Sequence, residues 1–144
     1  MSLRKSMKVD VDLASDGAWI NLDSYPNDDG TIPGFLMART SVEHNPKFAE
    51  AVQKLADRKK PANKQLSLAE QTALDGELMV SSLLLDWRNF EAEEDGVKLE
   101  YSTENAARIF KDPAWSDVRV LLASESANKS NYSALNRELA AKNS

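Results

Sequence analysis

The chain has 144 residues, of which 42% are hydrophobic and 28% are charged, and these are the size and composition of one soluble globular domain. Eighteen basic and 23 acidic residues leave a net charge of −5, which argues against binding to nucleic acid or to an anionic membrane, because both require clustered positive charge. With no cysteine and a single histidine, His44, the chain can form no disulfide, no thiol nucleophile and no multi-histidine metal site.

The N-terminal segment predicts no secretory signal, because its opening residues are charged and lack an apolar core. We therefore expect a soluble, cytosolic protein. Met7 offers a second possible start, so residues 1–6 are expected to be a frayed tail or an addition to the natural chain. The sequence predicts a single domain over 1–144, with a β-rich part at 7–42 and a helical part at 43–144.

Two short apolar runs, 18–22 and 34–39, flank a turn-rich segment that contains Asp29-Gly30. This pattern predicts an antiparallel hairpin. Residues 7–13 alternate between apolar and polar side chains, which predicts a third strand. Together these segments predict a small antiparallel sheet.

The pattern then changes to that of helices. Asn45-Pro46 places a capping residue before a proline at the first helical position, and apolar residues follow at helical spacing as far as the basic run 58–60. Residues 67–70 have the spacing of a capping box and predict a second helix that extends to about Trp87. Inside that helix, Gly76 is expected to cost about 1 kcal/mol relative to alanine.

The remaining predicted elements are short. An acidic turn leads into an extended segment at 97–101, Ser102 caps a brief helix, and Asp112-Pro113 opens another helix. A last short helix is expected between residues 132 and 143. The predicted fold class is α+β, mostly α-helical, with a small N-terminal antiparallel β-sheet followed by four to five helices.

The most acidic stretch is 86–104, where seven acidic and two basic residues give a charge equal to the net charge of the chain. Three interpretations are open. The stretch can be a solvated acidic loop, a cation or paired-carboxylate site, or a recognition surface for a basic partner. The first is favoured as the commonest role of such a stretch, since the spacing Glu93-x-Asp95 lacks the pattern of a calcium loop.

Other chemical motifs give weaker signals. The basic run 58–60 with Lys64 has no interleaved aromatic residues on which bases could stack, which favours a solvated helix end. His44 could act as a general base paired with Ser41 or Ser67, but the sequence has no nucleophile motif, so an exposed loop histidine is favoured over a general base. The five glycines are dispersed and form no phosphate-binding loop. We therefore expect no cofactor, no metal and no small-molecule substrate.

The order of several short motifs resembles the tail assembly chaperones of long-tailed, siphovirus-like bacteriophages and prophages. The N-terminal half has a Gly-x-Trp strand, a Gly-Phe strand that ends in arginine, and an Asn-Pro helix start. Tyr132 follows Asn131 where phenylalanine is more usual in that family. The likeness spans roughly residues 17–132, and its second half consists of Trp87 with Asn89-Phe90, the turn Glu93-Glu94-Asp95-Gly96, Tyr101-Ser102 before Glu104-Asn105-Ala106, and Asp112-Pro113.

The resemblance implies a non-catalytic protein that binds the tape measure protein, helps to recruit tail tube subunits, works in the cytoplasm of the bacterial host and is absent from the mature virion. It also implies a homo-oligomer, either open or spiral, because head-to-tail contacts that do not close produce spirals. The partner-binding candidates fall in two groups. The first is expected to build the junction beside the acidic turn, and the second to face a partner: Trp87, Asn89, Phe90, Tyr101 and Asn105, then Glu93, Glu94 and Asp95.

Two other functions remain open at this point. One is a structural component of the virion, such as a tail completion or connector protein. The other is a small regulatory or adaptor protein of the host that is unrelated to phage. An enzyme is the least supported class, because no pocket-forming set of catalytic residues is recognisable in the sequence.

Overall fold

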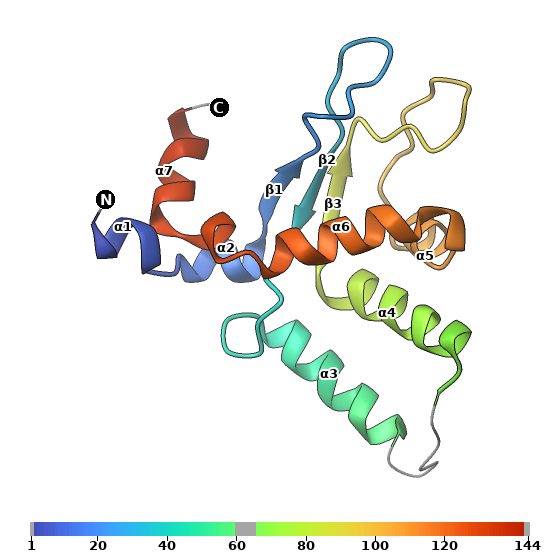
Figure 1. Cartoon of the computed structure of the whole chain (residues 1–144), viewed down its shortest axis with the longest axis horizontal. Helices are drawn as coiled ribbons and strands as arrows, with labels where there is room; N and C mark the ends of the chain where they lie inside the picture. The colour runs from blue at the N-terminus through green and yellow to red at the C-terminus, as the bar shows by residue number, and fades with distance from the viewer. Residues whose placement is uncertain (1, 60–65, 143–144) are drawn as a thin grey trace.

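The computed structural model describes residues 2–59 and 66–142 (Figure 1). It confirms the predicted class, an α+β fold that is mostly helical. Within the described residues, the elements in chain order are α1 (Leu3–Met7), α2 (Val11–Asp16), β1 (Ala18–Asn21), β2 (Gly34–Met37), α3 (Pro46–Lys59), α4 (Leu68–Ser82), β3 (Leu84–Arg88), α5 (Thr103–Phe110), the 3-10 turn η1 (Pro113–Trp115), α6 (Ser116–Ala127), the 3-10 turn η2 (Lys129–Tyr132) and α7 (Ala134–Lys142).

The sheet has three antiparallel strands in the order β1-β2-β3. The predicted hairpin is confirmed as β1 and β2, with Ile20 opposite Phe35. On the other side of β2, Phe35 is opposite Trp87 of β3. Alternate side chains of a strand point to opposite faces, and these three point to the face that the helices cover. In Figure 1, α6 crosses in front of the sheet, and α3 and α4 extend below it.

The strand predicted for residues 7–13 is wrong, because this segment forms parts of α1 and α2. The pattern alternates throughout, but the carboxylate of Asp10 accepts hydrogen bonds from the backbone N–H groups of Asp12 and Leu13, both at 3.1 Å. These bonds cap α2 and favour a helix over an extended chain. Only Val9 pairs as in a sheet, through an isolated bridge to Ser133. Residues 3–6, placed by the sequence in a possible tail, are helical in α1.

The helix predicted to reach Trp87 ends at Ser82, and residues 84–88 form the third strand instead. The capping box at Ser67 is confirmed. The last turn of α4 is bound from outside, because the Asn45 side chain donates a hydrogen bond of 3.0 Å to the carbonyl of Ser82. Beyond it, β3 pairs with β2, which satisfies the backbone groups on that side of the strand.

The other helix starts are confirmed. Asn45 Oδ1 accepts from the Phe48 N–H at 3.2 Å at the start of α3, and Ser102 Oγ accepts from the Asn105 N–H at 3.0 Å at the start of α5. Asp112-Pro113 opens the turn η1, which leads directly into α6. Residues 97–101, predicted as extended, run without regular secondary structure.

The main core lies between the covered face of the sheet and helices α4, α5 and α6. Aromatic rings fill its centre, with Phe35 in edge contact with Trp87, Phe90 and Phe110 at centroid distances of 6.2, 5.4 and 6.3 Å. Edge-to-face packing of this kind favours one fixed arrangement of the rings. A smaller core at the terminal end contains Ala14, Ala18 and Tyr132, which join α2 and β1 to η2.

Candidate functional site: an apolar groove with an acidic rim

Trp87 and Phe90, two of the predicted partner-binding residues, are inside the protein. Each is only 5% exposed. The Trp87 ring packs on Tyr101 with a centroid distance of 5.1 Å, and its Nε1 donates a 2.7 Å hydrogen bond to the carbonyl of Leu99. This bond fixes the returning chain after the acidic turn against β3. Trp87 is therefore part of the scaffold that positions the surrounding surface.

Asn89 holds the hairpin loop to the segment that follows β3. It has a φ of +55°, a left-handed conformation that asparagine tolerates better than most residues. Its side-chain amide donates to the carbonyl of Ile32 at 3.1 Å, and its own carbonyl accepts from the Asn27 side chain at 2.8 Å. Asn89 thus links the β1–β2 loop with the chain that leads into the acidic turn.

Tyr101 and Asn105 are half-buried and lie in the chain that follows the acidic turn. The Tyr101 hydroxyl donates to the Leu84 carbonyl at 3.4 Å, and the Asn105 side chain donates to the Glu100 carbonyl at 2.9 Å. Burial raises the pKa of Tyr101, and the nearby charge of Asp86 raises it further. Both residues therefore brace the segment between the acidic turn and α5.

Glu93, Glu94 and Asp95 are exposed in the turn after Phe90. Asp95 also shapes the turn, since its carboxylate accepts from the Val97 N–H at 3.0 Å. Glu93 and Asp95 line a shallow hollow of about 320 Å³ that also contains Asn105 and Arg108. The structure thus brings three of the predicted partner-binding residues, Glu93, Asp95 and Asn105, to one surface.

Lys98 ties the two loops of this end together. Its ammonium group forms ion pairs with Glu91 and with Asp29, at 2.9 Å from Asp29 Oδ2. Hydrogen bonds to Glu91 and Asp29 raise the pKa of Lys98, and hydrogen bonds from Thr31 and Lys98 lower the pKa of Asp29. The pair with Asp29 joins the acidic turn to the β1–β2 loop, and the pair with Glu91 joins the two ends of the acidic turn, so the two loops form one surface.

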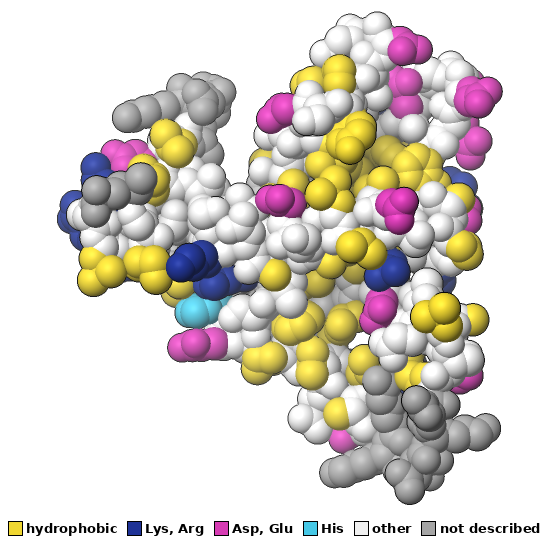
Figure 2. All heavy atoms as spheres, in the orientation of Figure 1, with side chains coloured by type: hydrophobic (Ala, Val, Ile, Leu, Met, Phe, Trp, Pro, Cys, Tyr) yellow, Lys and Arg dark blue, Asp and Glu magenta, His cyan; other side chains and the backbone are white. Residues whose placement is uncertain are grey.

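A groove of about 370 Å³ lies between these loops and α6, and we call it the α6 groove. Figure 2 shows hydrophobic side chains gathered in this hollow, with acidic side chains around it. Its lining is mainly apolar and includes two carboxylates, the exposed Asp117 and the half-buried Glu91, which is paired with Lys98. The lining residues are Leu22, Tyr25, Asn27, Pro33, Phe35, Phe90, Glu91, Trp115, Asp117, Val118 and Leu121.

Most of the α6 groove was missed by sequence reasoning. The helical spacing of Trp115, Val118 and Leu122 signals one apolar face, but the structure divides it. Leu122 is completely buried in the core, while Trp115 and Val118 are only half-buried and line the groove. The contribution of Leu22 and Tyr25 from the β1–β2 loop depends on tertiary packing and has no local signal in the sequence.

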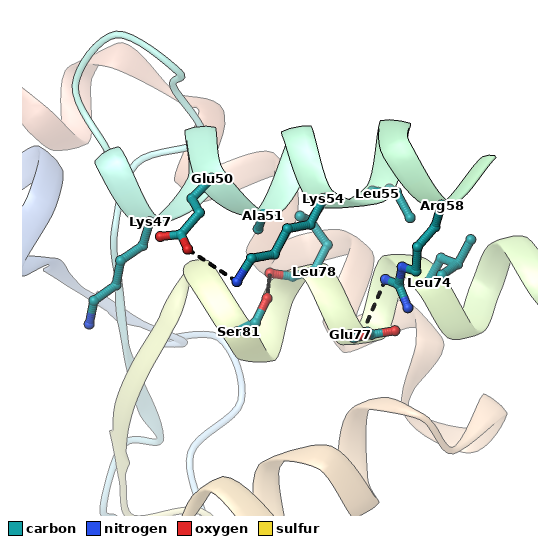
Figure 3. Close-up of a pocket in the computed structure, with 10 residues that line it drawn as sticks. All are labelled: Lys47, Glu50, Ala51, Lys54, Leu55, Arg58, Leu74, Glu77, Leu78 and Ser81. Carbon is teal, nitrogen blue, oxygen red and sulfur yellow. Dashed lines mark hydrogen bonds and ion pairs between the residues drawn. The ribbon is translucent and has the colours of Figure 1, made fainter. Parts of the chain in front are cut away.

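A second groove, of about 280 Å³, runs along the seam between α3 and α4 (Figure 3). Its floor is formed by aliphatic side chains where the two helices pack. Its rim consists of paired charges, with Lys54 at 3.1 Å from Glu50 and Arg58 at 3.2 Å from Glu77. Arg58 of the predicted basic run is therefore part of this helix pairing, whereas Lys60 and Lys64 lie outside the described residues.

His44 lies in the loop before α3, and its Nδ1 is 3.2 Å from Ser41 Oγ. The same Oγ accepts from the His44 backbone N–H at 3.2 Å, which is the geometry of a local turn before a helix. Within residues 2–59 and 66–142, no three His, Asp or Glu side chains are grouped as metal ligands. No helix described by the structure is long and apolar enough to cross a membrane.

Comparison with known families matches residues 43–143 with the YdaY prophage protein family. The chain belongs to the YdaY prophage protein family. The matched segment begins just before α3 and includes β3, the acidic turn and α6, whereas β1 and β2 precede it. Comparisons with curated proteins and with solved structures give no match. The protein is therefore a prophage protein, and an origin in the host unrelated to phage is wrong.

Proposed function

We propose that this prophage protein is a tail assembly chaperone that binds the tape measure protein and promotes tail tube assembly without catalysis. The observation that carries the proposal is the α6 groove, which is apolar inside and has carboxylates at its edge. A groove of this kind suits an amphipathic helix, whose apolar side chains enter the groove while basic side chains meet the rim. The resemblance described above suggests a largely helical client.

The surroundings of the groove support the proposal. The exposed Glu93, Glu94 and Asp95 lie in the turn that follows Phe90, and Phe90 lines the groove. Their charges extend the negative field around it and would speed the approach of a basic segment. The cross-links through Lys98 and Asn89 keep the two loops in place. A preformed site binds at a lower entropic cost than a loop that must first become ordered.

The test is co-expression of the full chain with a fragment of the tape measure protein from the same prophage. We expect the chain to keep the fragment soluble and to co-purify with it. The groove variant combines Tyr25→Lys and Asp117→Lys, two exposed positions that tolerate charge without unfolding the core. It should weaken binding at least about tenfold, which corresponds to about 1.4 kcal/mol.

The matched control combines Leu68→Lys and Asp57→Lys, which adds the same charge at exposed positions of α4 and α3. Binding should be unchanged in the control. Equal binding by the groove variant and by the control would refute the α6 groove as the client site. Reversing Glu93, Glu94 and Asp95 to lysine tests the acidic turn separately, and unchanged client solubility would remove these three residues from the partner surface.

The alternative, a structural component of the tail, makes the opposite prediction about the virion. A tail completion or connector protein is present in every particle, whereas a chaperone leaves before the particle matures. Mass spectrometry of purified particles therefore distinguishes the two. We expect the protein in the lysate of induced cells and not in particles, and its presence at fixed stoichiometry in particles would refute the chaperone role.

A further inference from the structure

The sheet has a free edge at β1, which is the outer strand and pairs only with β2 among the described residues. The ladder continues in register to Leu22, whose N–H donates to the Pro33 carbonyl at 2.9 Å. In an antiparallel pair, alternate residues direct their backbone groups toward the partner strand. Those of Trp19 and Asn21 are therefore directed away from β2, and in the described part of the chain they form no hydrogen bond.

This edge lacks most of the features that protect edge strands from pairing with another chain. Lysine, proline and bulges are the usual protection, but β1 has the sequence AWIN, and the irregularity of the sheet lies between β2 and β3. The side chains of Trp19 and Asn21 are exposed on the face of the sheet that the helices leave open. In Figure 1, β1 is the left strand, and α6 crosses the front of the sheet, so the open face is the far one.

A positive charge is held beside the free edge. Arg88 extends from β3 across β2, so that its guanidinium carbon lies 4.2 Å from the centroid of the Trp19 ring and its Nη2 donates to Asn21 Oδ1 at 3.0 Å. Gly34 makes this path possible. A Cβ at Gly34 would lie 2.5 Å from Asn21 Oδ1 and 3.1 Å from Arg88 Nε, so a larger residue would displace the arginine.

The charge of Arg88 is not balanced by an ion pair within residues 2–59 and 66–142. Asp86 lies on the same face of β3, but its carboxylate accepts from the Trp87 N–H at 2.8 Å and forms no pair with the guanidinium. Opposite charges on neighbouring strands stabilise their pairing, and like charges oppose it. An incoming strand with an acidic side chain is therefore favoured over the β1 edge of a second copy, which would bring another Arg88 to the same face.

We propose that an extended, acidic segment of another protein adds to the free edge of β1 as a fourth strand. Its backbone pairs with the outward groups of Trp19 and Asn21, and its carboxylate binds the Arg88 guanidinium. The α6 groove lies on the covered side of the sheet, where Phe35 lines it. The two sites are therefore separate, and this inference goes beyond the proposed function.

The test is an NMR titration of the full, isotope-labelled chain with a short peptide of alternating threonine and valine that carries one central glutamate. The amide signals of Trp19 and Asn21 should shift, because their N–H groups gain partners, whereas the Ile20 amide, which faces β2, should move much less. A peptide with lysine in place of the glutamate should bind at least about tenfold more weakly. The glutamate peptide methylated on every backbone nitrogen should not bind, because it has lost its donors.

Two variants test the two parts of the site. Arg88→Glu should reverse the preference, so that the lysine peptide binds more tightly than the glutamate peptide. Asn21→Pro removes one outward N–H at an edge position where proline is tolerated, and it should weaken binding of the glutamate peptide at least about tenfold. If this variant does not fold, the methylated peptide tests the same backbone pairing.

The matched control is the groove variant, Tyr25→Lys with Asp117→Lys, which should bind the glutamate peptide like the unaltered chain. Equal binding of the glutamate and lysine peptides, or shifts confined to residues of the α6 groove, would overturn the inference. Shifts of the Trp19 and Asn21 amides with protein concentration alone would assign the edge to a second copy and also overturn it. None of these results affects the proposed function, because the tape measure fragment binds in the α6 groove.

Discussion

Gly76 provides a prediction in which two physical effects oppose each other. Alanine has the higher helix propensity, so Gly76→Ala in α4 alone would stabilise the protein by about 1 kcal/mol. In the folded protein, however, a Cβ at this position would lie 2.5 Å from the carbonyl oxygen and 3.3 Å from the carbonyl carbon of Phe110. These are backbone atoms at the end of α5 and cannot rotate away.

This steric clash determines whether Gly76→Ala stabilises or destabilises the protein. A contact of 2.5 Å forces α4 and α5 apart, and overpacking of this kind costs about 1–3 kcal/mol. After the propensity gain is subtracted, we expect Gly76→Ala to destabilise the protein by about 1 kcal/mol, which lowers the melting temperature by about 3 °C for a chain of this size. The displacement also reaches Phe110, whose ring packs on Phe35 at the floor of the α6 groove.

The assay is urea unfolding followed by tryptophan fluorescence, since the chain has three tryptophans. The control is Ala73→Gly at an exposed position of the same helix, which measures helix propensity without a tertiary contact and should cost about 1 kcal/mol. A Gly76→Ala variant that is more stable than the unaltered chain by about 1 kcal/mol would refute the close approach of α4 and α5.

Three further predictions concern the residues that hold the fold and the groove. Burial raises the pKa of the Tyr132 hydroxyl far above 10, so the stability that this buried neutral group contributes is complete below pH 10 and is lost as the pH rises above it. Tyr132→Phe should cost about 1 kcal/mol at neutral pH, because the hydroxyl donates to the Met37 carbonyl at 2.8 Å. In urea unfolding, the variant should also lose less stability at alkaline pH than the unaltered chain. Asn89→Ala should destabilise the protein by about 2 kcal/mol in the same assay, more than Asn89→Gly, because glycine keeps the positive φ while both lose the bond to Ile32. Lys98→Met should speed amide hydrogen exchange in both loops at the groove, and unchanged exchange would show that its ion pairs do not hold them.

Local signals in the sequence predicted the elements whose ends are fixed by neighbouring residues. Asn45-Pro46, Ser67 with Glu70, and Ser102 all cap the helices expected of them. Such caps act over three or four residues, so they need no knowledge of the rest of the fold.

The two wrong elements depend on distant contacts. The leucines at 83–85 have a spacing that fits a helix or a buried strand, and the unpaired edge of β2 decides for the strand. Residues 7–13 alternate like a strand, but Asp10 caps α2 and the C-terminal η2 provides the packing surface. In both segments the local sequence fits a helix and a strand about equally well, and contacts with distant parts of the chain select one of the two.

The same distinction between local signals and distant contacts applies to the candidate site. The motif around Trp87 lies next to the α6 groove, but its residues Trp87 and Phe90 are buried and support the surface from inside. The α6 groove itself combines residues 22–35 with residues 90–121. No local sequence pattern indicates this surface, because it forms only when the β1–β2 loop and α6 pack together.

The most direct test of the central claim is site-specific photo-crosslinking in cells in which the prophage is producing tails. A photoreactive amino acid at Val118, inside the α6 groove, should crosslink to the tape measure protein, and the same group at Leu68, exposed on α4, should not. Equal crosslinking from both positions, or a Val118 adduct that contains no tape measure protein, would contradict the account.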